Sequence, residues 1–276
     1  MEDGFVFELY DVSFSYDNRL TAVDRVTLKI RAGERAAILG SNGSGKSTLL
    51  KIMDGLYFPT SGEACAFGRK LSGHAFQDEP FNFDFRRRVS LVFQDSDVQL
   101  FSPSVWDEVA FAPLQLGLSR EEVIARVEAA LSALRIEKLR DRAPHRLSGG
   151  EKKRVALASV LSLNPSVWLM DEPTAGLDPR SQSWLVDFIV EQGKAGKTIV
   201  TATHDLNIVE SIADRVYVLN EEHRLVAEGT PAQVLSDHAL LISCNLMHEH
   251  RHRHEDTEEE HAHPHIHLPL HQHEHK

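Results

Sequence analysis

The apolar and polar positions of the chain form a pattern in which short strands alternate with helices. Runs rich in β-branched and aromatic residues, which are typical of strands, stand at 5–16, 26–30, 35–39, 87–93, 167–171, 198–205 and 215–220. Helical spacing predicts helices over 104–161, 183–192 and 206–213, and another that ends near 55. Ser119 and Glu122 form a capping box, which marks a helix start. This alternation predicts an α/β core with a parallel sheet, into which a helical block over about 94–161 is inserted.

The last part of the chain follows no such pattern. The periodicity weakens after Asp237, and from His248 the sequence is too polar to bury a core. We therefore predict one folded domain over 1–240 and a disordered tail over 241–276.

The tail carries histidine at every second position in three runs: His248, His250, His252, His254; His261, His263, His265, His267; and His271, His273, His275. In an extended chain this spacing places side chains on one face, so neighbouring imidazoles can bind one ion. Neutral imidazole suits Ni²⁺, Cu²⁺, Zn²⁺ and Co²⁺, so the tail alone does not name a metal. Three interpretations stay open: a metal buffer or sensor, a solvated tail with incidental affinity, and an affinity tag, although other residues interrupt the runs.

Length and charge narrow the class of protein. A chain of 276 residues suits one large domain or two lobes. The formal net charge of −11 argues against nucleic acid as a partner, because such binders carry a basic stripe. Only two cysteines, Cys65 and Cys244, indicate a reducing compartment. The chain opens with acidic residues instead of a signal peptide and has no apolar run of membrane-spanning length, so a role at a membrane requires a partner.

A glycine-rich segment between a predicted strand and a predicted helix fits the pattern G-x-x-x-x-G-K-[ST]. Its residues are Gly40, Ser41, Asn42, Gly43, Ser44, Gly45, Lys46 and Ser47, followed by Thr48. Glycines without a Cβ let phosphate oxygens approach backbone N–H groups, and the following helix presents its positive end to the anion. Lys46 adds a mobile positive charge, and Ser47 can place a hydroxyl on Mg²⁺. The segment therefore predicts an ATP-type phosphate site.

A second segment, "VWLMDE" (167–172), supplies carboxylates for the same chemistry. Asp171 ends a buried strand and can hold Mg²⁺ through water. Glu172 follows directly and is placed to polarise an attacking water. Without the phosphate loop, an Asp-Glu pair after a strand would more often be a solvated turn.

The segment "LSGGEKKRVALA" (147–158) resembles the signature of ABC-type ATPases. The resemblance implies a P-loop NTPase fold with a parallel core sheet, an antiparallel β subdomain near the N-terminus and an inserted helical subdomain. It also implies that two chains hold two ATP molecules between them. Ser148, Gly149 and Gly150 would then contact the γ-phosphate that the other chain binds. Glu151 stands where the family usually has Gln, which leaves a ribose contact there in doubt.

The resemblance covers about 5–235 and assigns roles to further residues. Tyr16 corresponds to the aromatic residue that stacks on adenine, although an ordinary strand aromatic would look the same. Gln94 corresponds to the Gln that senses Mg²⁺ and the membrane partner. Asp178 lies in the loop that crosses the dimer interface, and His204 corresponds to the switch histidine at the γ-phosphate. Glu172, His204, Lys46 and Gln94 are thus the expected catalytic residues, and Ser47, Gln94 and Asp171 the expected Mg²⁺ ligands.

A narrower resemblance lies in 93–118, which is similar to the ATPases of energy-coupling-factor importers, particularly the cobalt and nickel branch. In that family this stretch forms part of the groove that receives a helix of the membrane component. The implied protein powers nickel or cobalt import from the cytoplasmic face of the membrane, as a homodimer or with a related ATPase, together with transmembrane coupling and substrate-binding subunits. Two alternatives stay open: an ATPase of a vitamin importer, and a soluble ABC ATPase without a role in transport.

Overall fold

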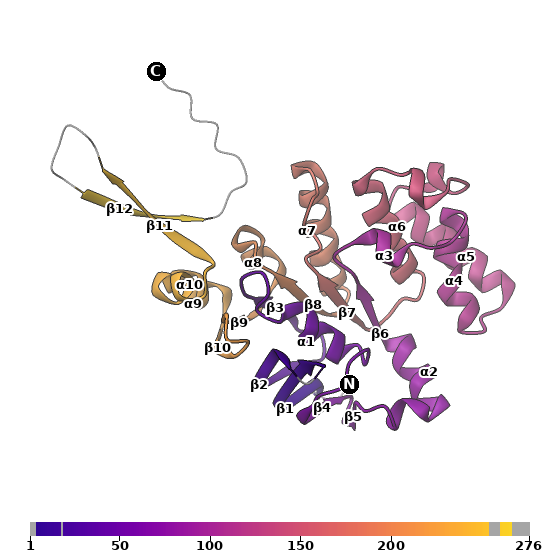
Figure 1. The fold of residues 1–276 in the computed structure, drawn as a ribbon. Helices are drawn as coiled ribbons and strands as arrows, with labels where there is room; N and C mark the ends of the chain where they lie inside the picture. The colour runs from indigo at the N-terminus through magenta and orange to yellow at the C-terminus, as the bar shows by residue number, and fades with distance from the viewer. Residues whose placement is uncertain (1–3, 18, 254–259, 267–276) are drawn as a thin grey trace, which may run out of the picture.

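The computed structural model describes residues 4–17, 19–253 and 260–266, and for 248–253 and 260–266 it describes the backbone alone. Its central sheet has six strands in the order β10-β9-β3-β8-β7-β6 (Figure 1). These strands are β3 (Arg35–Leu39), β6 (Val89–Val92), β7 (Val167–Asp171), β8 (Thr198–Thr203), β9 (Arg215–Leu219) and β10 (Leu225–Gly229). All neighbouring pairs are parallel except β9 and β10, which confirms the predicted α/β fold with a parallel core sheet.

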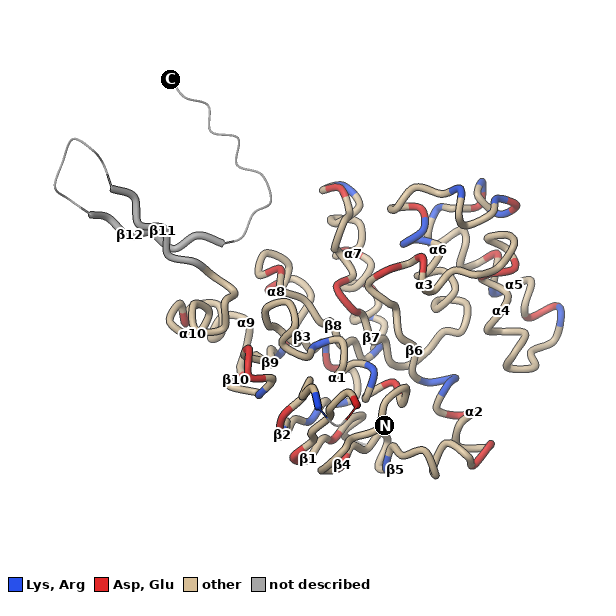
Figure 2. The backbone as a smooth tube through the Cα atoms, viewed as in Figure 1, with Lys and Arg blue, Asp and Glu red and all other residues tan. Residues whose placement is uncertain are grey.

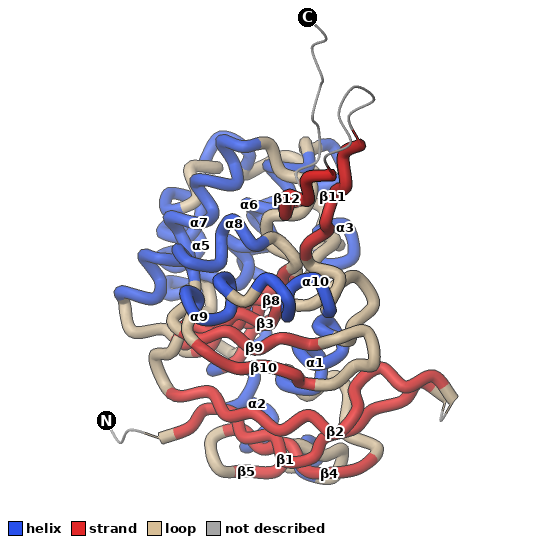
Figure 3. Tube along the Cα trace, turned by 90° about the vertical axis from the view of Figure 1, so that its left-hand side faces the viewer, coloured by secondary structure: helices blue, strands red, loops and turns tan. Residues whose placement is uncertain are grey.

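A second sheet of four strands, in the order β2-β1-β4-β5, lies below the first (Figure 3). Its strands are β1 (Phe5–Tyr16), β2 (Leu20–Arg31), β4 (Ser61–Ala66) and β5 (Arg69–Lys70). Helix α1 (Lys46–Met53) lies between the two sheets and buries Leu49, Leu50, Ile52 and Met53 completely. Because both sheets contact this helix, the start of α1 is fixed at the end of β3.

Strand β3 shows why the parallel sheet reads as an unbroken apolar run. Ala36 and Ile38 pack into the core that contains α1, whereas Ala37 and Leu39 pack into the core under the helices on the opposite face. Both faces are buried from Ala36 to Leu39, so this part of β3 has no alternating polar positions. The helices on that opposite face include α7 (Pro179–Lys194), α8 (Leu206–Ile212) and α9 (Pro231–Ser236).

The helical block lies between β6 and β7 in the sequence, where the pattern of apolar residues predicts it. It contains α3 (Ser96–Gln99), α4 (Val105–Gln115), α5 (Arg120–Ala133) and α6 (Gly149–Leu161), with 3₁₀ turns at Glu137–Leu139 and Pro144–Arg146. The capping box of Ser119 and Glu122 is present at the start of α5, as predicted. A second capping box, formed by Ser148 and Glu151, begins α6.

The sequence pattern missed several short elements. The strand predicted over 87–93 begins only at Val89, because the preceding residues belong to α2 (Glu79–Arg88). Phe81 and Phe85, one helical turn apart, bury that helix against the core. The pattern also did not predict β4, β5, β10, α9, α10 (His238–Ser243) or the 3₁₀ turn Ala75–Gln77. These elements are too short for a clear period of apolar residues.

The C-terminal segment, predicted to be disordered, contains two strands in its described part. Strands β11 (Met247–Arg253) and β12 (Glu260–Ile266) pair antiparallel in a separate sheet. His254, His267, His271, His273 and His275 lie outside the described residues. None of the helices in the described part of the chain is both long and apolar enough to cross a bilayer.

Asp54 caps the end of α1 and is buried, with Arg86 as its one ionic partner among the described residues. Arg86 of α2 places Nη1 3.3 Å from the Asp54 Oδ2 and donates from the same atom to the Asp54 carbonyl at 2.7 Å. Burial raises the pKa of Asp54 from 3.8 to about 7, and the Arg86 charge offsets only part of that rise. An acid whose pKa rises on folding holds its proton more tightly in the folded state. Stability from this group is therefore complete below its unfolded pKa and is lost as the pH rises through its folded pKa.

Replacing Asp54 by Asn removes this titration, so we expect Asp54→Asn to flatten the loss of stability between pH ~5 and pH ~8. Thermal unfolding of both proteins at the two pH values measures it. The Tm of the wild type should fall more steeply than the Tm of the variant. Asp84→Asn, which removes an exposed acid of α2, should follow the wild type. Parallel slopes for wild type and Asp54→Asn would contradict the assignment.

Candidate nucleotide site

The glycine-rich loop links the end of β3 to the start of α1. Gly45 has φ 104°, and a Cβ there would lie 2.0 Å from the Ala22 carbonyl oxygen, so this position admits only glycine. Gly43 has φ 85° and nothing within 4 Å of where its Cβ would be. Gly45 lets the backbone pass close to β2, and Gly43 leaves open space over the loop for an anion.

Lys46 is held inside the loop. Its Nζ donates to the carbonyls of Gly40 at 2.8 Å and Ser41 at 3.0 Å, and lies 3.4 Å from Glu172 Oε1. Burial lowers the pKa of Lys46, and the Glu172 carboxylate offsets part of that effect. The buried hydroxyls of Ser41 and Ser44 have no hydrogen-bond partner in the described structure. Buried donors without a partner in a positively charged loop fit phosphate oxygens.

Ser47 at the start of α1 contacts Asp171 at the end of β7. The Ser47 hydroxyl donates to Asp171 Oδ1 at 2.9 Å. Burial raises the pKa of Asp171, which the Ser47 hydrogen bond partly offsets. A buried carboxylate beside a hydroxyl is a pair of hard oxygen donors next to the phosphate loop, and this donor set fits Mg²⁺.

Glu172 adopts a strained backbone conformation, with φ 40°. Its N–H donates to the Ala202 carbonyl of β8 at 2.9 Å, and its side chain is enclosed. Oε1 lies 2.9 Å from His204 Nδ1, and Oε2 accepts from the Thr203 hydroxyl at 3.3 Å. Contacts from Thr203 at the end of β8 and from His204 directly after it hold the two carboxylate oxygens in place, which is how strain persists at functional sites. The two predicted residues Glu172 and His204 are therefore in direct contact.

The loop opens into a cavity of about 530 Å³. Predicted residues lining it are Tyr16, Asn42, Gly43, Gly45, Lys46, Ser47, Thr48, Gln94 and Glu172. The sequence reasoning missed four other lining residues, Leu20, Thr21, Ala22 and His223. They come from the start of β2 and from the turn before β10, and no local motif marks them. The Tyr16 hydroxyl is 3.0 Å from the Thr48 hydroxyl oxygen, so this side chain reaches the first turn of α1.

A buried lysine joins Gln94 to α6, which begins with the signature residues and is called the signature helix below. Lys153 of α6 donates to the carbonyls of Phe93 at 3.2 Å and Gln94 at 3.0 Å. Lys152 forms an ion pair with Asp97 of α3. The loop after β6 is thus attached to α6, so a displacement of either is passed to the other.

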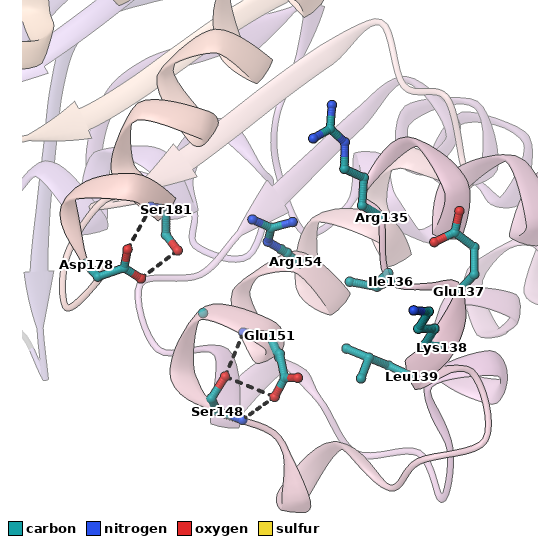
Figure 4. Close-up of a pocket in the computed structure, with 11 residues that line it drawn as sticks. Arg135, Ile136, Glu137, Lys138, Leu139, Ser148, Glu151, Arg154, Asp178 and Ser181 are labelled. Carbon is teal, nitrogen blue, oxygen red and sulfur yellow. Dashed lines mark hydrogen bonds between the residues drawn. The ribbon is translucent and has the colours of Figure 1, made fainter.

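The signature residues do not meet the phosphate loop of the same chain. Ser148, Gly150, Glu151 and Asp178 line a different hollow of about 690 Å³, whose lining shares no residue with the first cavity (Figure 4). Asp178 caps α7 and accepts from the Ser181 hydroxyl at 2.7 Å, and that bond, with backbone N–H groups, lowers the pKa of Asp178. Each chain therefore offers two separate surfaces with groups suited to a nucleotide.

A family model described as "ABC transporter" matches residues 23–175. The nickel import ATP-binding protein NikO of Rhodobacter capsulatus is 48% identical over 244 residues, which cover 87% of this chain and 95% of that protein. The chain belongs to the ABC transporter ATP-binding family.

Solved structures of other ABC proteins have a similar fold. CbiO1 from Clostridium perfringens, described as part of the ABC transporter complex cbiONQ, matches with a TM-score of 0.75 and 37% identity, over 89% of this chain and 96% of that one. The dimeric structure of the ABC transporter cassette MJ0796 matches with 0.73 and 28% identity, over 82% and 98%. As a member of the family, the protein is an ATPase that uses ATP and Mg²⁺, dimerises and works with membrane subunits of a transporter.

In this ABC ATPase the geometry makes Glu172 the residue to test first. Glu172→Gln keeps the shape of the side chain but removes the charge that polarises water, so we expect retained ATP binding and turnover lowered about 10²- to 10⁴-fold. Nucleotide binding and steady-state phosphate release measure the two effects. Glu128→Gln, which neutralises an exposed acid of α5, is the matched control and should keep full activity. If Glu172→Gln hydrolyses ATP at the wild-type rate, Glu172 does not polarise the attacking water.

Proposed function

We propose that this ABC ATPase powers the import of a transition-metal ion, nickel or cobalt, through separate membrane subunits. The similarity to the nickel import protein NikO over nearly the whole chain carries the proposal. The histidine-rich tail supports the same class of metal, because imidazole is a suitable ligand for both ions. An ATPase of a vitamin importer is the alternative within the family, and purified transport complexes assayed for metal uptake separate the two.

The separation of the two hollows supports a site made by two chains. Lys46 and the loop amides of one chain would hold the γ-phosphate, and Ser148 at the start of α6 of the partner would close the site from the opposite side. The positive end of a helix and the bare backbone at Gly149 and Gly150 suit an anion there. Both halves are present in this chain, so a homodimer has two complete sites, and a related ATPase can replace one copy.

Within such a site, the residues of this chain have distinct roles. Glu172 orients and polarises the attacking water, and His204, in contact with Glu172 Oε1 at 2.9 Å, stands at the γ-phosphate side. Ser47, Asp171 and Gln94 would hold Mg²⁺, which supplies charge neutralisation on the phosphate oxygens when bound. Tyr16 would stack on adenine. Phosphoryl transfer needs mainly positioning and electrostatic stabilisation, and this arrangement offers both.

An apolar surface on α3 and α4 supports docking to a membrane subunit. We call it the docking surface: Val98, Phe101, Phe111 and Leu114, all exposed. Phe101 and Phe111 form an edge-to-face pair with ring centroids 4.9 Å apart. Buried Glu108 accepts from the N–H groups of Phe101 at 2.9 Å and Ser102 at 2.8 Å, which fixes the loop that carries Phe101. Exposed large apolar side chains grouped on a rigid support are typical of an interaction site.

The docking surface is also attached to the nucleotide site. Gln99 of α3 accepts from the Phe93 N–H at 3.2 Å and donates to the Ala156 carbonyl of α6 at 3.0 Å. Together with Lys153, this connects the docking surface to Gln94 and to the signature helix. A membrane subunit held here would therefore move with the closure of the ATP site, at the cytoplasmic face of the membrane.

Phe101→Asp with Phe111→Asp should release the protein from membranes of cells that make its membrane subunits, because charges replace the apolar contact. The fraction that sediments with membranes measures it. Ile124→Asp with Val226→Asp is the matched control, since both side chains are exposed apolar residues that do not belong to the docking surface. Circular dichroism and ATPase activity of the purified variants must equal those of the wild type. Unchanged sedimentation of the folded Phe variant would contradict the docking role.

We propose further that the tail binds Ni²⁺ or Co²⁺ beside the importer. The backbone register pairs His248 with His265, His250 with His263, and His252 with His261. Residues two apart in a strand share one face, so this register brings six histidine positions to one face of the two-stranded sheet. Imidazole is a preferred ligand of both ions. The register thus supports a binding role over an ordinary solvated tail.

Calorimetry with Ni²⁺ tests the tail. The full chain should bind several Ni²⁺ per monomer near pH ~7.5 and lose most of them near pH ~5, where histidine becomes protonated. A variant that ends at Leu246 should keep Mg-ATP hydrolysis and lose this binding. Equal Ni²⁺ stoichiometry with and without the tail would show that the tail is not the metal site.

A further inference from the structure

Glu151 occupies the Ser148 hydroxyl that the proposed ATP site needs. The Ser148 Oγ donates to Glu151 Oε2 at 3.0 Å, and the Ser148 N–H donates to the same oxygen at 2.8 Å. In return, the Glu151 N–H donates to Ser148 Oγ at 3.4 Å. A serine hydroxyl has one proton. While it points to Glu151, it is not available to a phosphate oxygen.

The carboxylate also places negative charge in the hollow. The hydrogen bonds from the Ser148 backbone and side chain lower the pKa of Glu151, so the group is ionised at neutral pH. Figure 4 shows Glu151 beside Ser148, with Asp178 on the facing helix and Arg135, Lys138 and Arg154 on the remaining walls. An incoming triphosphate would be attracted by these three cations. At Ser148 itself it would be repelled by the negative charge of Glu151.

We propose that Glu151 is a positioning residue that sets the ATP concentration at which two chains close. It withholds the Ser148 hydroxyl from the γ-phosphate of the partner's ATP and repels that phosphate until the hydroxyl rotates away. The inference rests on the proposed two-chain site. Glu151 would change the ATP concentration needed for two chains to associate, and it would not change the hydrolysis step at Glu172.

Gln at this position separates charge from helix capping. The Gln amide oxygen accepts from the Ser148 N–H as the carboxylate does, so the capping box is retained. The same amide oxygen can also accept from the Ser148 hydroxyl, but it is uncharged and therefore a weaker acceptor than the carboxylate, so the hydroxyl turns to phosphate more easily. Glu151→Gln therefore removes the charge and weakens the competing acceptor while α6 keeps its start. Glu151→Ala removes the cap as well and controls for loss of the helix start.

The experiment measures ATP-dependent dimerisation of the full chain by analytical ultracentrifugation, with Glu172→Gln in every variant to prevent hydrolysis. Adding Glu151→Gln should lower the ATP concentration for half-maximal dimer about three- to tenfold, from one unit charge removed a few ångströms from phosphate. Raising the NaCl concentration to ~0.5 M should narrow this difference, since salt screens exposed charges. A purely structural effect of the substitution would not respond to salt in this way.

Two further variants make the outcomes distinct. Adding Ser148→Arg should abolish the dimer while ATP binding to the monomer persists. If Ser148→Arg abolishes the dimer but Glu151→Gln leaves the half-maximal ATP concentration unchanged, the role of Glu151 is overturned and the two-chain site stands. If Ser148→Arg dimerises normally, or the parent stays monomeric at every ATP concentration, the two-chain site itself fails. A gain in Glu151→Ala as large as in Glu151→Gln shows that removing the charge suffices, whereas a gain in Glu151→Ala alone overturns the proposal.

Discussion

The buried contact between Lys46 and Glu172 is the constraint around which the nucleotide site is arranged. Both side chains are about 5% exposed, and their charged atoms lie 3.4 Å apart. Burying two charges costs more free energy than their attraction returns unless other hydrogen bonds complete the shell. The loop carbonyls complete it for Lys46, and His204 and Thr203 complete it for Glu172. The pair therefore requires α1, β7 and β8 in one relative position, which the two sheets around α1 provide.

Two surfaces with groups suited to a nucleotide, held apart on one chain, are the reason for proposing that catalysis requires two chains. The connection from Lys153 to the Gln94 carbonyl and from Gln99 to α6 gives closure a mechanical route to the docking surface. Lys153 is 3% exposed, and burial lowers its pKa, so the contact it makes is expensive to break. In the proposed closure, these contacts would connect the ATP site to the place where a membrane subunit would sit.

Charge is distributed in a way that suits this role. Acidic and basic positions are interspersed over the described tube, without a continuous basic stripe (Figure 2). Cations instead stand locally where phosphate is expected: Lys46 in the loop, and Arg135, Lys138 and Arg154 around the hollow beside Ser148. Local placement of this kind favours a small anionic ligand over a long polyanion.

The sequence by itself determined the phosphate loop, the Asp171-Glu172 strand end and the helix start at Ser119, because each depends on residues close together in the chain. It also determined the parallel sheet, since buried strands carry their own apolar signal. Only the tertiary structure decided which distant groups meet: His204 with Glu172, Lys153 with Gln94, and His223 with the cavity. It also showed that the Ser148 hydroxyl is taken by Glu151 and that the signature faces away from the loop of its own chain. Such contacts depend on how strands and helices pack across the sheet, and no local spacing along the chain encodes that packing.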